Sequence, residues 1–248
     1  MLDKTSLTST AAKTLGNRAK WLNTYIEEAE FFEKVLDSDV SRLPTGSHLV
    51  EIGSGIGRMT SRLTHRFGTV IAADVDATFL ERCRETVAKH GVINRLRTAH
   101  VTDGHTVPLA DNSVDAVFSY ITLQHCSNAD ALALTKESLR VTKPHGVVML
   151  NYRTWVLADI FLQPTGAIVR ALWKTKVFGP WLAKQRVATR LGWQANRVST
   201  SDVLDVIRHS GRPCNEIVLF HHPHRRRSLL AGITDRVIGG SGIQERVL

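Results

Sequence analysis

The chain has 248 residues, 43% of them hydrophobic, which is enough for one α/β domain with an insertion and a sizeable core. Its three cysteines are far apart and odd in number, which argues against a disulfide framework and against a zinc site built from Cys pairs. The net charge of +9 lies in the C-terminal part: residues 1–150 hold 17 basic and 17 acidic side chains, whereas residues 151–248 hold 15 and 6.

This charge asymmetry indicates an anionic partner, such as an acidic substrate, a lipid surface or a nucleic acid, with a merely solvated basic face as the alternative. The first 20 residues lack the apolar core of a secretory signal peptide, and no apolar stretch reaches the ~18 residues that a membrane span needs. We therefore expect a cytoplasmic protein, with association to a membrane surface as an open alternative.

The predicted elements begin with a helical cover in residues 1–44. Apolar residues recur there at steps of three and four over residues 21–36, which is the period of an amphipathic helix. Residues 45–153 then alternate strands and helices, which predicts a parallel sheet with helices on both faces. The strands are expected over 47–53, 69–75, 95–101, 114–121 and 147–153, and the helices over 57–67, 77–91 and 129–142.

The pattern changes in residues 154–198, which contain four of the five tryptophans, seven Lys and Arg, and one acid. We interpret this segment as a helical insertion that Pro164 and Pro180 break into pieces. In residues 199–248, a capped helix over 199–211 and a strand over 216–220 are expected to complete the core.

The first predicted strand runs into a glycine-rich turn, in which Gly53, Gly55 and Gly57 follow the acidic Glu51. Glycines at a strand–helix junction let a ligand approach the backbone, because no β-carbon intervenes. The spacing differs from the G-x-G-x-x-G of dinucleotide sites, and Glu51 would oppose a pyrophosphate. A ligand with a positive end and no phosphate therefore fits better.

This turn resembles the E/D-x-G-x-G-x-G motif of class I S-adenosylmethionine (SAM)-dependent methyltransferases, and the resemblance extends over roughly residues 45–152. Asp74 stands at the end of the second strand, where this family places its ribose-binding acid; Asp76 is the alternative. The stretch around Asp103 and Gly104 resembles the family's D-G or D-A pair, which implies that Asp103 accepts the adenine amino group. Its "VPLADNS" departs slightly from the commoner L-P-F order.

A further stretch, "ESLRVTKPHGVVML", resembles the family's R-V-L-K-P-G-G pattern, with Thr142 in place of leucine and His145 in place of glycine. Pro144 and Gly146 still suit the second and fourth positions of a type I turn. The resemblance implies a Rossmann-like, mostly parallel sheet of seven strands with a helical lid, SAM as the cofactor, and no metal.

By the same resemblance, the cofactor would be held by residues that follow the first, second, third and fourth strands. Among them, Arg58 could approach the SAM carboxylate or could be a solvated residue of the first helical turn. The expected cofactor-binding residues are Glu51, Gly53, Ser54, Gly55, Gly57, Arg58, Asp74, Val75, Thr102, Asp103, Gly104 and Tyr120.

The candidate catalytic residue is His125, which follows the strand that carries Tyr120 at the carboxyl edge of the sheet. A neutral imidazole there could accept the proton of a hydroxyl acceptor during methyl transfer. The alternative is that His125 only orders the loop after this strand.

The acceptor that we expect is a hydroxyl of a small molecule, anionic or amphiphilic in character, such as a lipid or a glycoside. Alternatives are carbon methylation of a quinone-like substrate, an RNA methyltransferase, or a SAM-binding protein without catalysis. After the fourth predicted strand the chain has "SYIT" in place of the D/N-P-P-Y motif of nucleic-acid amino methyltransferases, so no specific nucleic-acid partner is expected. Residues 154–198 could form a lid over the acceptor, rest on a membrane surface or make a homodimer interface.

Overall fold

A computed structural model describes residues 43, 48–155, 157, 159–182, 196–212, 214 and 217. The chain divides into two compact units, Met1–Arg153 and Thr154–Leu248. The predicted helix over residues 21–36 lies outside the described residues, as does the strand expected over 216–220 apart from residue 217. Of the seven expected strands, five are described.

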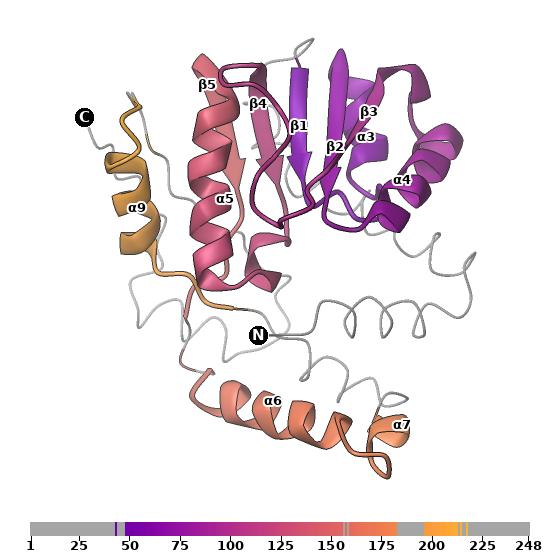
Figure 1. Cartoon of the computed structure of the whole chain (residues 1–248), viewed down its shortest axis with the longest axis vertical. Coiled ribbons are helices and arrows are strands. Elements are labelled where there is room, and N and C mark those ends of the chain that lie inside the picture. The colour runs from indigo at the N-terminus through magenta and orange to yellow at the C-terminus, as the bar shows by residue number, and fades with distance from the viewer. Residues whose placement is uncertain are drawn as a thin grey trace. The chain divides into compact units, whose positions relative to one another are not determined.

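The first unit is built on a parallel sheet of five described strands in the order β3-β2-β1-β4-β5 (Figure 1). The chain moves outward from β1 to β3 and then returns to the other side of β1. At such a reversal the connections leave a crevice at the carboxyl ends of the two central strands, β1 and β4. The strands are β1 (His48–Ile52), β2 (Thr69–Asp74), β3 (Leu96–His100), β4 (Val114–Ser119) and β5 (Thr142–Leu150).

Three helices cover this sheet: α3 (Thr60–Arg66), α4 (Ala77–His90) and α5 (Asn128–Val141) (Figure 1). Leu63 of α3 packs with Leu49 and Val70, whereas Leu80 and Cys83 of α4 pack further along the same sheet face. Helix α5 follows β4 and contacts β5. Because the central strands are covered on both faces, their side chains are buried in continuous runs, as in β2.

The sequence predicted β1 to β4 closely, but it expected β5 from residue 147 although this strand begins at Thr142, and it placed the start of α3 too early. The helix was expected from residue 57, whereas it begins at Thr60, so that Arg58 lies in the turn before it. Gly57 has φ +86, which is incompatible with a right-handed helix. The glycine-rich turn therefore extends up to Met59, the residue before the helix.

The prediction of a type I turn at residues 143–146 was wrong. Strand β5 begins at Thr142, and its pairing with β4 is irregular between Val114 and Ala116. His145 has φ +66, whereas the third position of a type I turn needs a φ of about −90°. The glycine that the family pattern carries at this position therefore corresponds to a left-handed backbone, which His145 adopts here.

The second unit contains α6 (Asp159–Trp173), α7 (Gly179–Leu182) and α9 (Thr200–Arg208). The helical character of the insertion is thus confirmed for α6 and α7. The expected break at Pro164 is wrong, because α6 continues through this residue. Helix α9 confirms the helix predicted over 199–211, although it ends at Arg208 and the side chain of Ser199 makes no capping hydrogen bond. Gly211 follows the helix with φ +70.

Candidate functional site

The carboxyl edge of β1 is tied directly to the loop after β4. The Thr122 hydroxyl donates to the Gly53 carbonyl at 3.1 Å, and the Gly53 N–H donates to the Ala73 carbonyl at 2.7 Å. A β-carbon at Gly53 would lie only 2.0 Å from the Thr122 side chain. This glycine therefore permits the close approach of the loops after the two central strands, and no sequence pattern indicated Thr122 as its partner.

The other two glycines of the turn serve different purposes. A β-carbon at Gly57 would lie 3.0 Å from the Cα of Cys83, so this glycine lets the turn pack on α4. At Gly55, which has φ +53, no described atom lies within 4 Å of the position that a β-carbon would take. Gly55 therefore offers open backbone at the crevice, which fits a ligand lying against the turn. The neighbouring Ser54 is buried, and its hydroxyl has no hydrogen-bond partner among the described residues.

The acidic residue before the turn, Glu51, is buried beneath it. The Thr60 hydroxyl donates to Glu51 Oε2 at 2.6 Å. Burial raises the pKa of Glu51 from 4.5 to about 8, although the bond from Thr60 and the charge of Arg58 both lower it. At neutral pH this carboxyl is therefore mostly protonated, and a cationic ligand beside it would favour its ionised form.

The second acid, Asp74, holds the glycine-rich turn in place. Its Oδ2 accepts the Gly55 N–H at 2.8 Å, and its Oδ1 accepts the Asp76 N–H at 3.0 Å. Burial raises the pKa of Asp74, and these N–H groups oppose the rise. Asp76, the alternative ribose acid, instead caps α4 by accepting the Thr78 N–H at 2.8 Å. The geometry thus favours Asp74 over Asp76 as the acid that faces the turn.

The third acid, Asp103, organises the loop after β3. Its Oδ1 accepts the N–H groups of His105 and Thr106 at 2.9 and 2.8 Å. The Thr106 hydroxyl, together with these N–H groups, lowers the pKa of Asp103, so it is ionised at neutral pH. Gly104 has φ +86 and gives the loop its turn. Asp103 is exposed, as is Thr102 before it.

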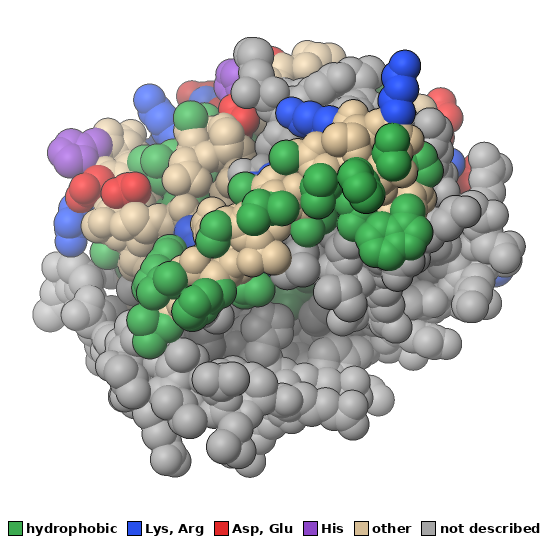
Figure 2. All heavy atoms as spheres, turned by 90° about the horizontal axis from the view of Figure 1, so that it is seen from below, with side chains coloured by type: hydrophobic (Ala, Val, Ile, Leu, Met, Phe, Trp, Pro, Cys, Tyr) green, Lys and Arg blue, Asp and Glu red, His purple; other side chains and the backbone are tan. Residues whose placement is uncertain are grey.

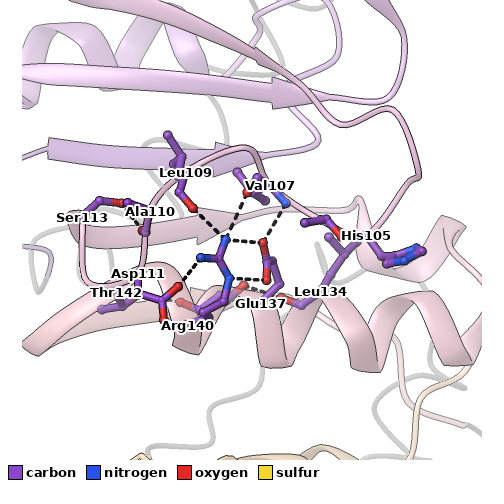
Figure 3. Close-up of polar contacts among 12 residues, drawn as sticks. His105, Val107, Leu109, Ala110, Asp111, Ser113, Leu134, Glu137, Arg140 and Thr142 are labelled. Atoms are coloured by element: carbon purple, nitrogen blue, oxygen red, sulfur yellow. Dashed lines mark hydrogen bonds and ion pairs between the residues drawn. The ribbon is translucent and has the colours of Figure 1, made fainter.

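A charged clamp from α5, which the sequence reasoning missed, holds the continuation of this loop (Figure 3). Arg140 donates through Nε and Nη2 to both carboxylate oxygens of Glu137, each at 2.7 Å. Arg140 Nη2 also donates to the carbonyls of Val107 and Leu109, at 3.1 and 2.8 Å. Glu137 Oε1 accepts the Val107 N–H at 2.8 Å. The E-x-x-R spacing within "ESLRV" was the available signal, because residues three apart meet on one helix face.

The loop after β4 carries the candidate base. His125 is exposed and ends the short 3₁₀ turn Leu123–His125, whose first bond joins the His125 N–H to the Thr122 carbonyl at 2.8 Å. Ile121 has φ +64, which is costly for a β-branched residue, and its N–H donates to Asn151 Oδ1 at 3.3 Å. Such strained residues gather at functional sites.

The structure places most of the expected site residues at one edge of the sheet. Glu51 contacts Thr60 just after the glycine turn, and Asp74 contacts Gly55 within it. The charge of Arg58 lowers the pKa of both Glu51 and Tyr120. Burial nevertheless raises the Tyr120 pKa, which keeps its phenol protonated. Val75 is exposed beside Asp74. Asp103 and Gly104 follow β3 at the same edge, and their roles toward a ligand stay predictions.

No helix among the described residues is both long and apolar enough to cross a membrane. The described ranges also contain no group of three or more His, Cys, Asp or Glu side chains arranged to hold a metal ion.

Comparison with known proteins matches residues 50–150 to a family described as a methyltransferase domain. The ubiquinone/menaquinone biosynthesis C-methyltransferase UbiE of Hahella chejuensis is 30% identical over 134 residues, covering 53% of this chain and 49% of the relative. The malonyl-[acyl-carrier protein] O-methyltransferase of Serratia marcescens is 31% identical over 106 residues, which cover 43% of this chain and 38% of the relative. The chain thus matches less than half the length of the first relatives.

A candidate methyltransferase of Bacillus halodurans has the same fold, with a TM-score of 0.52 and 17% identity over 72% of this chain and 67% of that one. The fold expected from the sequence is therefore confirmed as Rossmann-like, with five described strands. The cofactor of this family is SAM, and the open Gly55 backbone with Asp74 beside it fits such a ligand. Residues 50–150 thus match a methyltransferase domain, and over this region the chain is similar to class I SAM-dependent methyltransferases.

Proposed function

We propose that this protein transfers the methyl group of SAM to a hydroxyl of a small amphiphilic acceptor, such as a lipid or a glycoside. The observation that carries the proposal is the position of His125. Its exposed imidazole lies one 3₁₀ turn from Thr122, whose hydroxyl contacts the Gly53 carbonyl in the glycine-rich turn. A base at this place stands beside the expected cofactor site and remains accessible to an acceptor.

SAM, when bound, supplies a methyl group on a positively charged sulfur, which is already activated for transfer. The chain's own residues then have three tasks. The open backbone at Gly55 and the acids Asp74 and Asp103 would hold and orient the cofactor. Glu51 would lose its proton and balance the cationic end. His125 would accept the hydroxyl proton as the acceptor oxygen bonds to the methyl carbon, and would later release that proton to water.

Carbon methylation is the main alternative, because one relative is named as a C-methyltransferase and another as an O-methyltransferase at nearly equal identity. A carbon acceptor would not need a base at His125 in the same step. An RNA acceptor is supported only by the basic C-terminal charge. A SAM-binding protein without catalysis would keep the glycine-rich turn and would release no S-adenosylhomocysteine.

The test is transfer of a radiolabelled methyl group from SAM to fractionated lipids, glycosides, quinones and RNA at physiological salt. We expect label in a hydroxyl-bearing amphiphile, with the product identified by mass spectrometry. His125→Ala should then lower kcat by roughly 100- to 10,000-fold while SAM affinity stays nearly constant. The matched control is His48→Ala, because His48 is also exposed but begins β1 at the opposite edge of the sheet.

Several outcomes would contradict the proposal. Label in RNA alone would favour a nucleic-acid enzyme, since electrostatic binding by itself weakens steeply with salt. A normal kcat in His125→Ala would exclude the base role and favour a carbon acceptor. SAM binding without turnover on any fraction would favour a binding protein.

A further inference from the structure

Helices α6 and α7 present an unusual set of exposed apolar side chains (Figure 2). Phe161, Ile168 and Leu172 lie at positions i, i+7 and i+11 of α6, which places them on one face of the helix. Phe161 is 75% exposed and Ile168 61%. The exposed apolar set continues through the connection and α7 as Val177, Phe178 and Trp181. We call the side chains of Phe161, Ile168, Leu172, Val177, Phe178 and Trp181 the apolar face.

The opposite side of α6 is where the helix packs within its own unit. Asp159 and Gly166 are the buried residues of α6, and they lie on the far side of the helical wheel from Phe161 and Ile168. The Asp159 carboxylate accepts hydrogen bonds from the Nε and Nη2 of Arg197. The negative charge of Asp159 is thus neutralised by Arg197 within the second unit. It therefore adds no negative charge to the apolar face.

The charged residues nearest the apolar face are Lys174 and Lys176, which lie in the connection between α6 and α7 beside Val177 and Phe178. Arg170 lies on the side of α6 opposite Phe161. Lys174 and Lys176 are exposed. Figure 2 shows hydrophobic side chains gathered in a band across this face, with Lys and Arg side chains at its margin. Large apolar and aromatic groups beside Lys and Arg are typical of helices that lie in the plane of a membrane interface.

We propose that the apolar face of α6 and α7 docks on the surface of an anionic lipid bilayer. Phe161, Ile168 and Phe178 would enter the boundary between headgroups and acyl chains, and Lys174 and Lys176 would meet the lipid phosphates. An exposed apolar set of this size marks an interaction site in a water-soluble protein, and the adjoining positive charge selects a negatively charged partner. The inference does not depend on the identity of the methyl acceptor.

A second copy of the chain fits this face less well. A two-fold interface would bring the same patch together with itself, so that Lys174 and Lys176 of both copies would approach one another. Like charges placed opposite each other weaken an interface. The described part of this segment, residues 159–182, offers no acid except the paired Asp159 to offset that repulsion.

The test is sedimentation of the full chain with vesicles at physiological salt. Vesicles of equal parts phosphatidylcholine and phosphatidylglycerol are compared with vesicles of phosphatidylcholine alone. We expect binding to the mixed vesicles and much weaker binding to the neutral ones. Lys174→Ala and Lys176→Ala should each weaken binding about fivefold, which corresponds to ~1 kcal/mol for a basic residue near an anionic surface.

The apolar contribution is tested by Phe161→Asp and Phe178→Asp, each expected to weaken vesicle binding at least tenfold. Both side chains are exposed, so these variants should unfold at the same temperature as the parent chain. The matched control is Ile93→Asp, since Ile93 is a similarly exposed apolar residue in the other unit, and its vesicle binding should be unchanged. Failure of the parent chain to bind mixed vesicles would overturn the proposal. Equal weakening by Ile93→Asp, or a dimer in light scattering that Phe161→Asp dissociates without any vesicle binding, would also overturn it.

Discussion

Thr60, the first residue of α3, donates a 2.6 Å hydrogen bond from its hydroxyl to Glu51, and both side chains are buried under the glycine-rich turn. A buried carboxyl group thus lies directly beneath the turn at which the family binds a cationic cofactor. The pair connects the strand before the turn to the helix after it. The protonation of Glu51 therefore affects both the stability of the ligand-free chain and its affinity for SAM.

The first prediction concerns the stability of the ligand-free chain. In the folded state Glu51 keeps its proton up to about pH 8, whereas an unperturbed carboxyl releases it near 4.5. The folded chain therefore binds more protons between these values, so the free energy of unfolding should fall as pH rises from 4.5 to 8. Denaturant titrations should show this decline, and Glu51→Gln should reduce its slope. An identical slope in Glu51→Gln would show that the Glu51 carboxyl does not cause the pH dependence of the free energy of unfolding.

SAM binding should have the opposite pH dependence. A positive ligand favours the ionised carboxyl, so binding should release a proton and tighten as pH rises toward 8. Calorimetry in buffers of different ionisation enthalpy measures that proton directly. We expect proton release in the parent chain and less in Glu51→Gln.

The second prediction concerns the clamp on the loop after Asp103. Arg140→Lys removes the paired contact with Glu137 and at least one contact with the carbonyls of Val107 and Leu109. We expect unfolding to become easier by about 1–3 kcal/mol, the usual effect of losing hydrogen bonds to a charged group. SAM affinity should also fall, because the clamp holds the continuation of the loop that carries Asp103.

Arg208→Lys is the matched control for the clamp. Arg208 and Asp205 form a similar pair three residues apart on α9, but both are well exposed and 3.4 Å apart. Exposed pairs of this kind contribute little to stability, so this variant should behave like the parent chain. Equal effects of the two substitutions would show that the clamp has no special role.

The third prediction concerns the left-handed backbone at His145. Glycine adopts φ +66 without the steric cost that a side chain adds, which is about 1–2 kcal/mol. His145→Gly should therefore stabilise the chain by roughly 0.5–1 kcal/mol, because the greater freedom of glycine in the unfolded state offsets part of the gain. Asn112→Gly, at φ +54, should gain less, since asparagine tolerates this region. Thermal unfolding of both variants measures the difference; a loss of stability in His145→Gly would contradict the account.

The fourth prediction separates the two acids at the end of β2. Asp74→Ala should weaken SAM binding by about 10- to 150-fold, the effect of losing charged hydrogen bonds to the ribose. Asp76→Ala removes the cap of α4 and should cost ~1 kcal/mol of stability with little change in affinity. Unchanged affinity in Asp74→Ala would show that another residue holds the ribose.

The sequence predicted the sheet well, because continuous apolar runs such as β2 are buried on both faces and leave little ambiguity. It also located Glu51 and Asp74, since acids at strand ends stand out against apolar neighbours. It could not show that Thr60 would donate to Glu51 or that Thr122 would donate to the Gly53 carbonyl, because threonine is common and its partners depend on tertiary contacts. The start of α3 and the turn at His145 were misplaced because Gly57 and His145 adopt positive φ values, which the local sequence pattern does not specify.

The clamp from α5 was missed for a related reason. Glu137 and Arg140 look like an ordinary surface pair in the sequence, and only the fold brings the loop carbonyls of Val107 and Leu109 to Arg140 (Figure 3). The exposed apolar face of α6 was equally hidden, because apolar residues at helical spacing usually mark a core. Both features depend on what lies opposite a helix face, which the chain's local pattern does not specify.

The central claim is that the glycine-rich turn, with Glu51 below it and Asp74 beside it, binds SAM and not a dinucleotide. Isothermal calorimetry of the purified chain with SAM, S-adenosylhomocysteine and NAD tests this most directly. We predict micromolar binding of SAM and S-adenosylhomocysteine, with proton release for SAM, and little binding of NAD. Tighter binding of NAD than of SAM would contradict the account.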